Sequence, residues 1–248
     1  MTMDLTGTPA VVTGASRGFG RAIALALHQA GADVVAVARD GAALAQLRTE
    51  VVERLTTVSA DVTDPVVAGR IVERYRPRTL VLNAGAAPLM RPLQEQSWES
   101  FSRVWQTDVQ QVFHWTREAL LFPLAPSSTV IAMSSGAALF GSPLSGGYAG
   151  AKAMVRFLTG YAAAESDAAD LGIRFVSLLP QLTPQTDLGA MAVAAYARRE
   201  GLPVEEKIGR LGTTLRPDDV GKQIAELAAG DLAAGAYLVT PDGLKEIS

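Results

Sequence analysis

Short apolar runs rich in β-branched residues alternate along the whole chain with longer segments of helical periodicity. Strands that are apolar throughout and separated by helices form parallel sheets covered on both faces. The alternation therefore predicts a doubly wound α/β fold with a mostly parallel, seven-stranded sheet. Strands are expected at 9–13, 33–38, 54–59, 79–82, 128–133, 172–179 and 236–240, and helices at 17–30, 42–52, 65–75, 97–122, 147–167 and 217–229.

No linker or internal repeat divides the 248 residues, which are predicted to form one domain over 1–248. Residues 183–215 depart from the alternation, because this Ala-rich segment is inserted between the sixth expected strand and the last helix. In a doubly wound sheet such an insertion lies beyond the carboxyl ends of the strands, where ligands bind. We interpret the insertion as a substrate lid.

Composition excludes several classes of function. The chain has no cysteine, which rules out disulfides and thiolate chemistry, and its two histidines lie far apart in sequence, so no metal site is expected. A net charge of −3 without a basic cluster argues against a nucleic-acid partner. No uninterrupted apolar stretch is long enough for a membrane helix, and no targeting segment is recognised, so we expect no membrane partner and a cytoplasmic location.

A glycine-rich loop, Gly14-x3-Gly18-x-Gly20, follows the first expected strand and opens the first helix. Glycines let the backbone approach a pyrophosphate, and the helix N-terminus supplies free N–H groups and a positive dipole end. The alternative is a tight turn that binds nothing. We favour dinucleotide binding, with contacts from Gly14, Ser16, Arg17, Gly18, Phe19 and Gly20.

The end of the second expected strand indicates which dinucleotide binds. NAD sites usually place an acidic residue there, whereas this strand ends Ala38-Arg39. Arg39, with Arg17 from the glycine loop, suits a 2′-phosphate, because guanidinium groups match phosphate geometry. Asp40 lies beyond the expected acidic position. The sequence favours NADP, the alternative being that both arginines are ordinary surface residues.

Tyr148 and Lys152 are spaced to lie on one face of a helix, and Ser135 ends the fifth expected strand. Together with the glycine loop, Asp61-Val62 after the third strand and Asn83-Ala84-Gly85 after the fourth, this order resembles the short-chain dehydrogenase/reductase family over nearly the whole chain. The resemblance implies a Rossmann-like fold, a nicotinamide cofactor and hydride transfer between carbonyl and alcohol.

The resemblance also implies a role for each of these residues. Lys152 would favour the tyrosinate form of Tyr148, which exchanges a proton with the substrate oxygen, and Ser135 would orient that oxygen. Lys152 would also hold the nicotinamide ribose. Asp61, with Val62 beside it, would bond the adenine, although a turn role for Asp61 is the alternative. Asn83, Ala84 and Gly85 would line the adenosine ribose.

The chain departs from the family pattern at two places. Asp108 stands where the family usually carries an Asn linked to the proton relay. A carboxylate there either supports the relay by holding Lys152 as ammonium or pairs with it too strongly, and a surface position for Asp108 is the remaining alternative. After the sixth expected strand, Pro180-Gln181 replaces the usual Pro-Gly. We expect cofactor contacts from Pro180, Leu182 and Thr183.

Apolar residues dominate the three segments that would surround a substrate, at 86–93, 136–144 and 182–210. They favour an apolar or aromatic ketone or a 3-oxoacyl compound. The wide apolar stripe of the helix at 97–122 and the small residues of the next helix suggest a subunit interface, and the family's usual homotetramer uses these two helices. We expect an NADP-dependent carbonyl reductase; the alternative is a non-catalytic NADP(H)-binding regulator.

Overall fold

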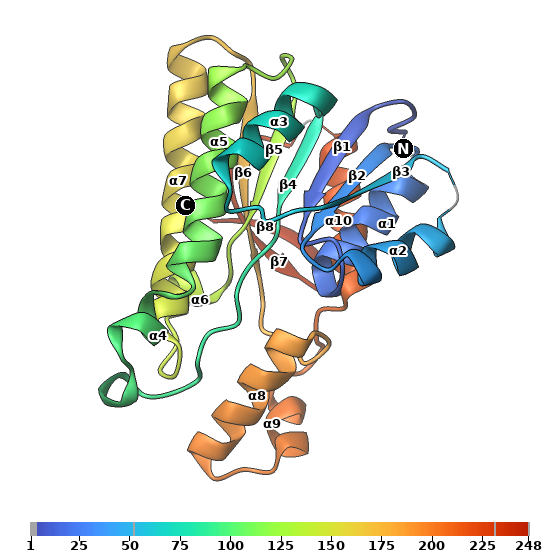
Figure 1. The fold of residues 1–248 in the computed structure, drawn as a ribbon. Coiled ribbons are helices and arrows are strands. Elements are labelled where there is room, and N and C mark those ends of the chain that lie inside the picture. Colours follow the sequence, from blue (N-terminus) through green and yellow to red (C-terminus); the bar gives the residue numbers. More distant parts are fainter. Residues whose placement is uncertain (1–3, 52, 231, 248) are drawn as a thin grey trace.

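Eight strands form one continuous sheet in the order β3-β2-β1-β4-β5-β6-β7-β8 (Figure 1). This computed structural model describes residues 4–51, 53–230 and 232–247. The strands β1 to β7 are mutually parallel, which confirms the predicted doubly wound, Rossmann-like α/β fold. Their bounds are β1 (Pro9–Thr13), β2 (Asp33–Ala38), β3 (Leu55–Ser59), β4 (Thr79–Leu82), β5 (Thr129–Met133), β6 (Arg174–Pro180) and β7 (Gly235–Thr240).

The sequence prediction missed the eighth strand. β8 (Gly243–Ile247) runs antiparallel to β7, with Thr240 paired to Gly243 across a tight turn. The turn carries Asp242-Gly243, a dipeptide typical of hairpins. The strand itself is short and only partly buried, so it lacks the apolar run that marks the other strands.

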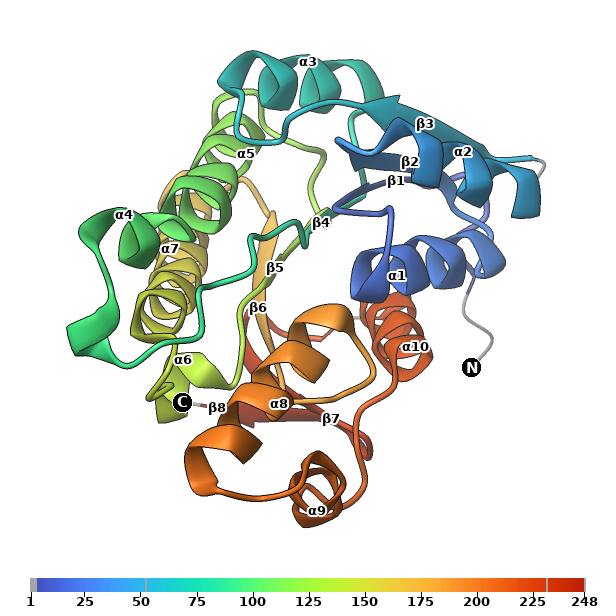
Figure 2. The ribbon, with the colours of Figure 1, turned by 60° about the horizontal axis from the view of Figure 1, so that its bottom comes forward.

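Helices cover both faces of the sheet. α1 (Gly18–Gln29), α2 (Gly41–Glu50) and α10 (Pro217–Ala229) pack on one face, and α3 (Pro65–Tyr75), α5 (Gln110–Leu121) and α7 (Gly146–Ala168) on the other. Figure 2 shows α1 and α10 on the side of the sheet opposite α5 and α7. Each layer encloses its own apolar cluster, with Ile23 and Leu27 in the first and Trp115 and Phe175 in the second. The predicted end of the second helix, Val52, lies outside the described residues.

The helix predicted over 97–122 is interrupted, so the expectation of one continuous helix is wrong. Residues Trp98–Ser102 form α4, Trp105–Val109 form the π-helical turn η2, and α5 follows. A π-helical turn holds more residues than an α-helical one and changes the direction in which the following side chains point. Asp108 belongs to η2 and is buried there, which excludes a surface position for it.

Short helices and loops occupy the carboxyl end of the sheet. α6 (Ala137–Phe140) follows β5, the 3-10 turn η1 (Leu93–Glu95) lies in the β4 connection, and α8 (Asp187–Glu200) and α9 (Val204–Arg210) lie within the inserted segment. Figure 1 shows α8 and α9 beyond the end of the sheet. Among the helices of the described residues, none has the length and apolar character needed to cross a membrane.

Small residues at the start of α7 allow α4 and η2 to approach it closely. A Cβ atom on Gly147 would lie 2.1 Å from the carbonyl oxygen of Phe101, and a Cβ on Gly150 would lie 3.4 Å from the indole of Trp105. The Trp105 Nε1–H donates a hydrogen bond to the Gly147 carbonyl oxygen (3.0 Å). This contact fixes η2, and with it Asp108, against the helix that carries Tyr148 and Lys152.

The close approach predicts opposite effects for two Gly→Ala substitutions in α7. We expect Gly147→Ala to lower the free energy of unfolding by about 1–3 kcal/mol, because the new methyl group meets backbone that must move. Gly160→Ala is the matched control, since nothing lies within 4 Å of its Cβ position, and it should raise stability by about 0.5–1 kcal/mol. Urea unfolding measures both, and equal effects would contradict the packing argument.

Candidate active site

The glycine loop brings the N-terminus of α1 to the carboxyl end of β1. Gly14 and Gly18 have φ of +67° and +53°, a left-handed conformation that favours glycine. A Cβ on Gly20 would lie 2.1 Å from the Gly14 carbonyl oxygen, so the helix packs directly on the loop. Ser16 is half-buried in this loop, and the Phe19 side chain packs against the core beneath α1.

The N-terminus of α1 fits the phosphates of a dinucleotide. Within the described ranges no side chain caps α1, whereas Asp40 caps α2 by accepting from the Ala43 N–H and Asp64 caps α3 by accepting from the Val66 N–H. Uncapped N–H groups together with the positive end of the helix dipole attract anions. The cap engages the Oδ1 atom of Asp40, the carboxylate that follows the end of β2.

The ends of β1 and β4 are tied together at the point where the strand order reverses. The Asn83 amide donates from Nδ2 to the Thr13 carbonyl oxygen (3.1 Å), and its backbone N–H donates to Thr13 Oγ1 (2.9 Å). Gln111 of α5 accepts from Thr13 Oγ1 (2.7 Å) and donates to the Ala84 carbonyl oxygen (2.5 Å). Sequence reasoning missed Gln111, although its signal is a polar residue on the buried face of a helix.

The residues expected around the adenosine half lie at the ends of β2 and β3. Arg39 is exposed. The Asp61 Oδ1 atom accepts from the backbone N–H and the hydroxyl of Thr63, and these bonds, helped by the charge of Arg39, hold the pKa of Asp61 below its usual value. Val62 is buried, and its carbonyl oxygen accepts from the Trp115 Nε1–H (2.8 Å). Arg17 is exposed and lies 3.5 Å from Asp187 of α8.

Tyr148 and Lys152 lie one turn apart on α7, as their spacing predicts. The Lys152 ammonium lies 5.6 Å from the centre of the Tyr148 ring and donates a hydrogen bond to the Met133 carbonyl oxygen at the end of β5 (2.9 Å). Tyr148 is half-buried, whereas the Lys152 side chain is only 7% exposed. The lysine therefore lies beneath the tyrosine at the carboxyl end of the sheet.

Asp108 forms a buried ion pair with Lys152. Its Oδ2 atom lies 2.9 Å from Lys152 Nζ, its side chain is 1% exposed, and its Oδ1 accepts from the Ala86 N–H (2.8 Å). A Cβ on Gly85 would lie 2.8 Å from Oδ2, so the carboxylate packs against this glycine. Burial lowers the pKa of Lys152, but the charges of Asp108 and Tyr148 and the hydrogen bond that the ammonium donates to Asp108 outweigh it and raise that pKa above its ordinary value.

Ser135 lies just beyond the end of β5, next to a serine that is hydrogen-bonded to the backbone of Lys152. Its hydroxyl oxygen accepts from the Ala137 N–H (3.2 Å), and the neighbouring Ser134 hydroxyl donates to the carbonyl oxygen of Lys152 (2.7 Å). Ser135 is half-buried, as Tyr148 is, so both side chains reach solvent. The end of β5 and the Lys152 turn of α7 are thus hydrogen-bonded to each other.

The segment after β6 carries Pro180, Leu182 and Thr183, the three cofactor contacts predicted for it. The Pro180 carbonyl oxygen accepts from the Gly136 N–H (2.9 Å), and Leu182 is partly exposed. The Thr183 side chain is buried, donates from Oγ1 to the Leu215 carbonyl oxygen (2.6 Å) and accepts from the Gln185 N–H (3.2 Å). Its hydroxyl proton is therefore already used to join the two ends of the inserted segment. The parts of the chain that the structure describes hold no group of three acidic or histidine residues suited to a metal.

A family model described as short chain dehydrogenase matches residues 8–196. The chain therefore belongs to the short-chain dehydrogenase family and is an oxidoreductase of that family. Cis-4-hydroxycyclohexanecarboxylate dehydrogenase of Sinomonas cyclohexanicum is 32% identical over 244 residues, which cover 94% of this chain and 95% of the relative. Carbonyl reductase (NADPH) 2 of Sus scrofa is 35% identical over 113 residues, or 46% of each protein.

Solved structures agree on the fold. The 3-ketoacyl-(acyl-carrier-protein) reductase of Brucella melitensis, solved with NADH, superposes with a TM-score of 0.78 at 26% identity over 95% of this chain and 98% of its own. An NAD⁺-bound xylitol dehydrogenase superposes with a TM-score of 0.82 at 20% identity over 94% and 98% of the two chains. A nicotinamide dinucleotide is thus the kind of cofactor that this fold accommodates.

The buried ion pair predicts non-additive losses of stability. Lys152→Met leaves Asp108 charged and unpaired in the interior and should lower the free energy of unfolding by about 3–5 kcal/mol. Adding Asp108→Asn to that variant removes the stranded charge and should restore part of the loss. Urea unfolding of the two single variants and the double variant measures the coupling; simple additivity would contradict it.

The pH dependence of this loss follows from the raised pKa of Lys152. When a group has a higher pKa in the folded than in the unfolded state, it stabilises the folded protein fully at pH values below its unfolded-state pKa. This stabilisation is lost as the pH rises through the folded-state pKa. The stability gap between the wild type and Lys152→Met should therefore be flat through neutral pH and shrink only above about pH 10.5, as unfolding in urea at a series of pH values would show.

Proposed function

We propose that the protein transfers a hydride between NADP(H) and a carbonyl or alcohol substrate, as a carbonyl reductase. The observation that carries the proposal is the placement of Tyr148 over the buried Lys152, whose ammonium is bonded to the Met133 carbonyl oxygen at the carboxyl end of β5. That end of a doubly wound sheet is where ligands bind. The family membership supports oxidoreductase chemistry, and the site residues supply the proton transfer that such chemistry needs.

Each site residue has one proposed task. The bound nicotinamide supplies the hydride in reduction or accepts it in oxidation. Tyr148 gives its phenolic proton to the carbonyl oxygen during reduction and takes it back from the alcohol during oxidation. Ser135 holds the same oxygen through its hydroxyl. The Lys152 ammonium uses one N–H on Met133 and faces Asp108 with another, so a third is left for a ribose hydroxyl.

Removing the Tyr148 hydroxyl tests this proposal. We expect Tyr148→Phe to lower kcat about 10²–10⁴-fold, because general acid catalysis is lost while the ring remains. Tyr161→Phe is the matched control, since Tyr161 is exposed on the same helix, and it should retain full activity. Oxidation of NADPH in the presence of aromatic, aliphatic and thioester-linked ketones measures both.

NADPH binding without turnover over the whole ketone panel would favour the second candidate, a regulator that binds the dinucleotide. The observation behind that candidate is the pairing of Asp108 with Lys152, which occupies the lysine more strongly than a neutral amide would.

We propose NADP(H) rather than NAD(H) as the cofactor. Ala38 ends β2 without a carboxylate, Arg39 is exposed beside it, and Asp40 serves as the cap of α2. Arg17 lies at the start of α1 with its guanidinium exposed. The name of the Sus scrofa relative includes NADPH, whereas the two solved neighbours hold NADH or NAD⁺, so the choice rests on these residues of the chain.

Arg39→Ala should weaken NADPH binding about 10–100-fold and leave NADH binding nearly unchanged, because a charge-assisted bond to phosphate is worth about 1.5–3 kcal/mol. Arg48→Ala is the matched control, an exposed arginine on the following helix, and should change neither affinity. Fluorescence titration of both dinucleotides measures the four affinities. Equal losses for NADH and NADPH would contradict a contact with the 2′-phosphate.

We propose an apolar or aromatic ketone, or a 3-oxoacyl compound, as the substrate. Large apolar side chains in the three segments predicted to surround it are exposed to solvent, which is the state expected of a surface that receives an apolar ligand. The names of two relatives concern ring compounds, cis-4-hydroxycyclohexanecarboxylate and hydroxynaphthalene. The exposed large apolar residues of these segments are Leu89, Leu93, Leu139, Phe140, Leu182, Leu188, Met191 and Val204.

We propose that the inserted segment, residues 183–215, closes over the substrate, within a single domain. Two contacts join it to the rest of the site. Tyr196 of α8 shares a hydrogen bond with the Ser142 hydroxyl in the loop before α7, and Asp187 faces Arg17 of the glycine loop. Ser142 is in turn bonded to Ser145, which precedes α7. A lid held at these points lies over both the cofactor loop and the start of the catalytic helix.

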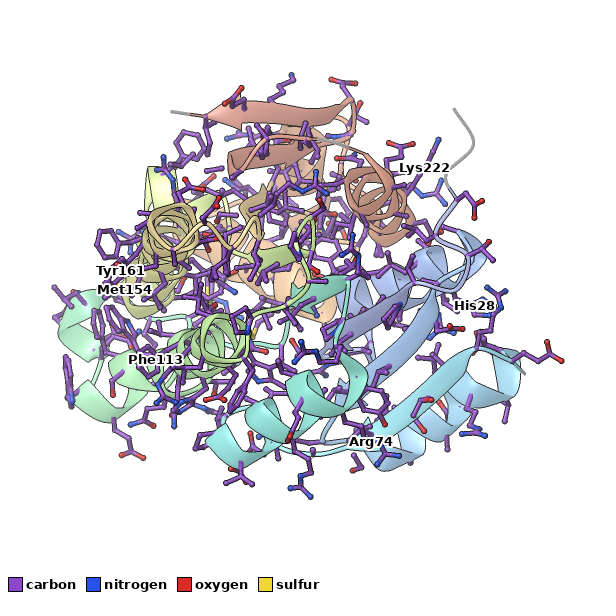
Figure 3. All side chains as sticks on the ribbon, turned by 90° about the horizontal axis from the view of Figure 1, so that it is seen from above. His28, Arg74, Phe113, Met154, Tyr161 and Lys222 are labelled. Carbon is purple, nitrogen blue, oxygen red and sulfur yellow. The ribbon has the colours of Figure 1, made fainter. Side chains whose placement is uncertain are left out.

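We propose that α5 and α7 form the interface of a homotetramer. Their outward surface carries a shallow apolar groove lined by Trp105, Val109, Phe113, Met154 and Leu158. Figure 3 shows Phe113, Met154 and Tyr161 on the same side of the molecule. Exposed aromatic residues of this kind anchor subunit interfaces.

Sedimentation velocity measures the assembly. Phe113→Glu should dissociate it, because a charge would be buried in the interface, while Val66→Glu, on the exposed side of α3, should not.

A further inference from the structure

Asp108 makes two contacts that a neutral amide at this position cannot both make. One carboxylate oxygen accepts from the Ala86 N–H and the other faces the Lys152 ammonium. An Asn side chain has a single acceptor oxygen, and its NH₂ group would face the ammonium as a second donor. Both oxygens of the Asp108 carboxylate are therefore in contact with a donor group, and the side chain has almost no exposure to water.

The pairing changes the charge that Tyr148 experiences. A lone ammonium one turn away would favour the tyrosinate, whereas an ammonium paired at 2.9 Å with a buried carboxylate forms a nearly neutral unit. Asp108 and Tyr148 are the titratable groups that act on Lys152. The other groups that the side chains of the pair bond within the described structure are uncharged: the Met133 carbonyl of β5 and the Ala86 N–H after β4.

We propose that Asp108 is a positioning residue whose charge offsets that of Lys152 and keeps the phenol of Tyr148 protonated through the neutral range. Tyr148 is then protonated at the start of the reaction, which suits reduction of a carbonyl, where a proton is donated, better than oxidation of an alcohol. In reduction the phenolic proton passes to the carbonyl oxygen as the hydride reaches the carbon, and solvent later reprotonates the tyrosinate. The inference rests on the proposed role of Tyr148 as the proton donor.

The test follows the ionisation of Tyr148 directly in the cofactor-free protein. Tyrosinate absorbance in the near ultraviolet is recorded during an alkaline titration, and the curve of the Tyr148→Phe counterpart is subtracted to remove the other four tyrosines. The same difference is measured in the Asp108→Asn background. We expect tyrosinate at Tyr148 to appear about one pH unit lower in the Asp108→Asn variant than in the wild type, a tenfold change in proton affinity.

The matched control is Glu118→Gln. Glu118 is also a buried acid on α5, but it pairs with Arg117 and faces α3, so its loss should leave the Tyr148 curve unchanged. If the ionisation midpoint of Tyr148 is unchanged or higher in Asp108→Asn, the proposal is overturned. The charge of Asp108 would then not be what keeps the Tyr148 phenol protonated. If Asp108→Asn does not fold, Asp108→Ser serves as the second variant, since it removes the charge without adding volume.

The titration separates this inference from the proposed function. A shift in Asp108→Asn with no turnover on any ketone would keep the role of Asp108 and reject the reductase. Turnover that depends on Tyr148, without a shift, would keep the reductase and reject the role of Asp108. In an active enzyme the pH at which alcohol oxidation reaches half its maximal rate should also fall by about one unit in Asp108→Asn.

Discussion

The ion pair between Asp108 and Lys152 is the constraint around which the site is arranged. Two charges removed from water are stabilised when further hydrogen bonds add to their mutual attraction. The Met133 carbonyl oxygen at the end of β5 accepts one from the lysine, and the Ala86 N–H in the loop after β4 donates one to the aspartate. The pair thereby joins two adjacent strand ends to the π-helical turn and to α7, and any arrangement that separated these elements would strand a buried charge.

The fold was predictable because its signals are local and repeated. β-branched runs such as residues 33–38 bury both of their faces, so the strands are apolar throughout, and Asp64-Pro65 marks the start of α3. Besides the helices α6, α8 and α9, two features of the sheet and its main helices escaped prediction. β8 lies at the edge of the sheet and is only half-buried, so its sequence carries no apolar run. The π-helical turn depends on how Trp105 meets Gly147 in another helix, which no pattern within residues 97–122 contains.

The positions of the candidate site residues in the fold could be predicted from the sequence better than the contacts between their side chains. The spacing of Tyr148 and Lys152 and the place of Ser135 after a strand follow from the fold. The pairing of Asp108 with Lys152 was among the alternatives that the family resemblance offered, but helix periodicity alone does not indicate it, because the pairing depends on the π-helical turn. The cofactor contact expected of Thr183 stays a prediction, and the bond from its hydroxyl to the Leu215 carbonyl oxygen is a contact that the sequence alone does not indicate. Gln111 was missed because a helix pattern does not reveal which strand ends it reaches.

Gln111 and Asp108 stand three residues apart at the junction of η2 and α5. Gln111 braces the end of β1, where the glycine loop begins, and Asp108 braces Lys152 beneath Tyr148. One short stretch of backbone thus supports both halves of the site. In the proposed reductase, loosening of this stretch by heat or by a distant substitution would weaken nucleotide affinity and proton transfer in parallel. The inserted segment, residues 183–215, is supported from elsewhere and can diverge in sequence while that shared support stays intact.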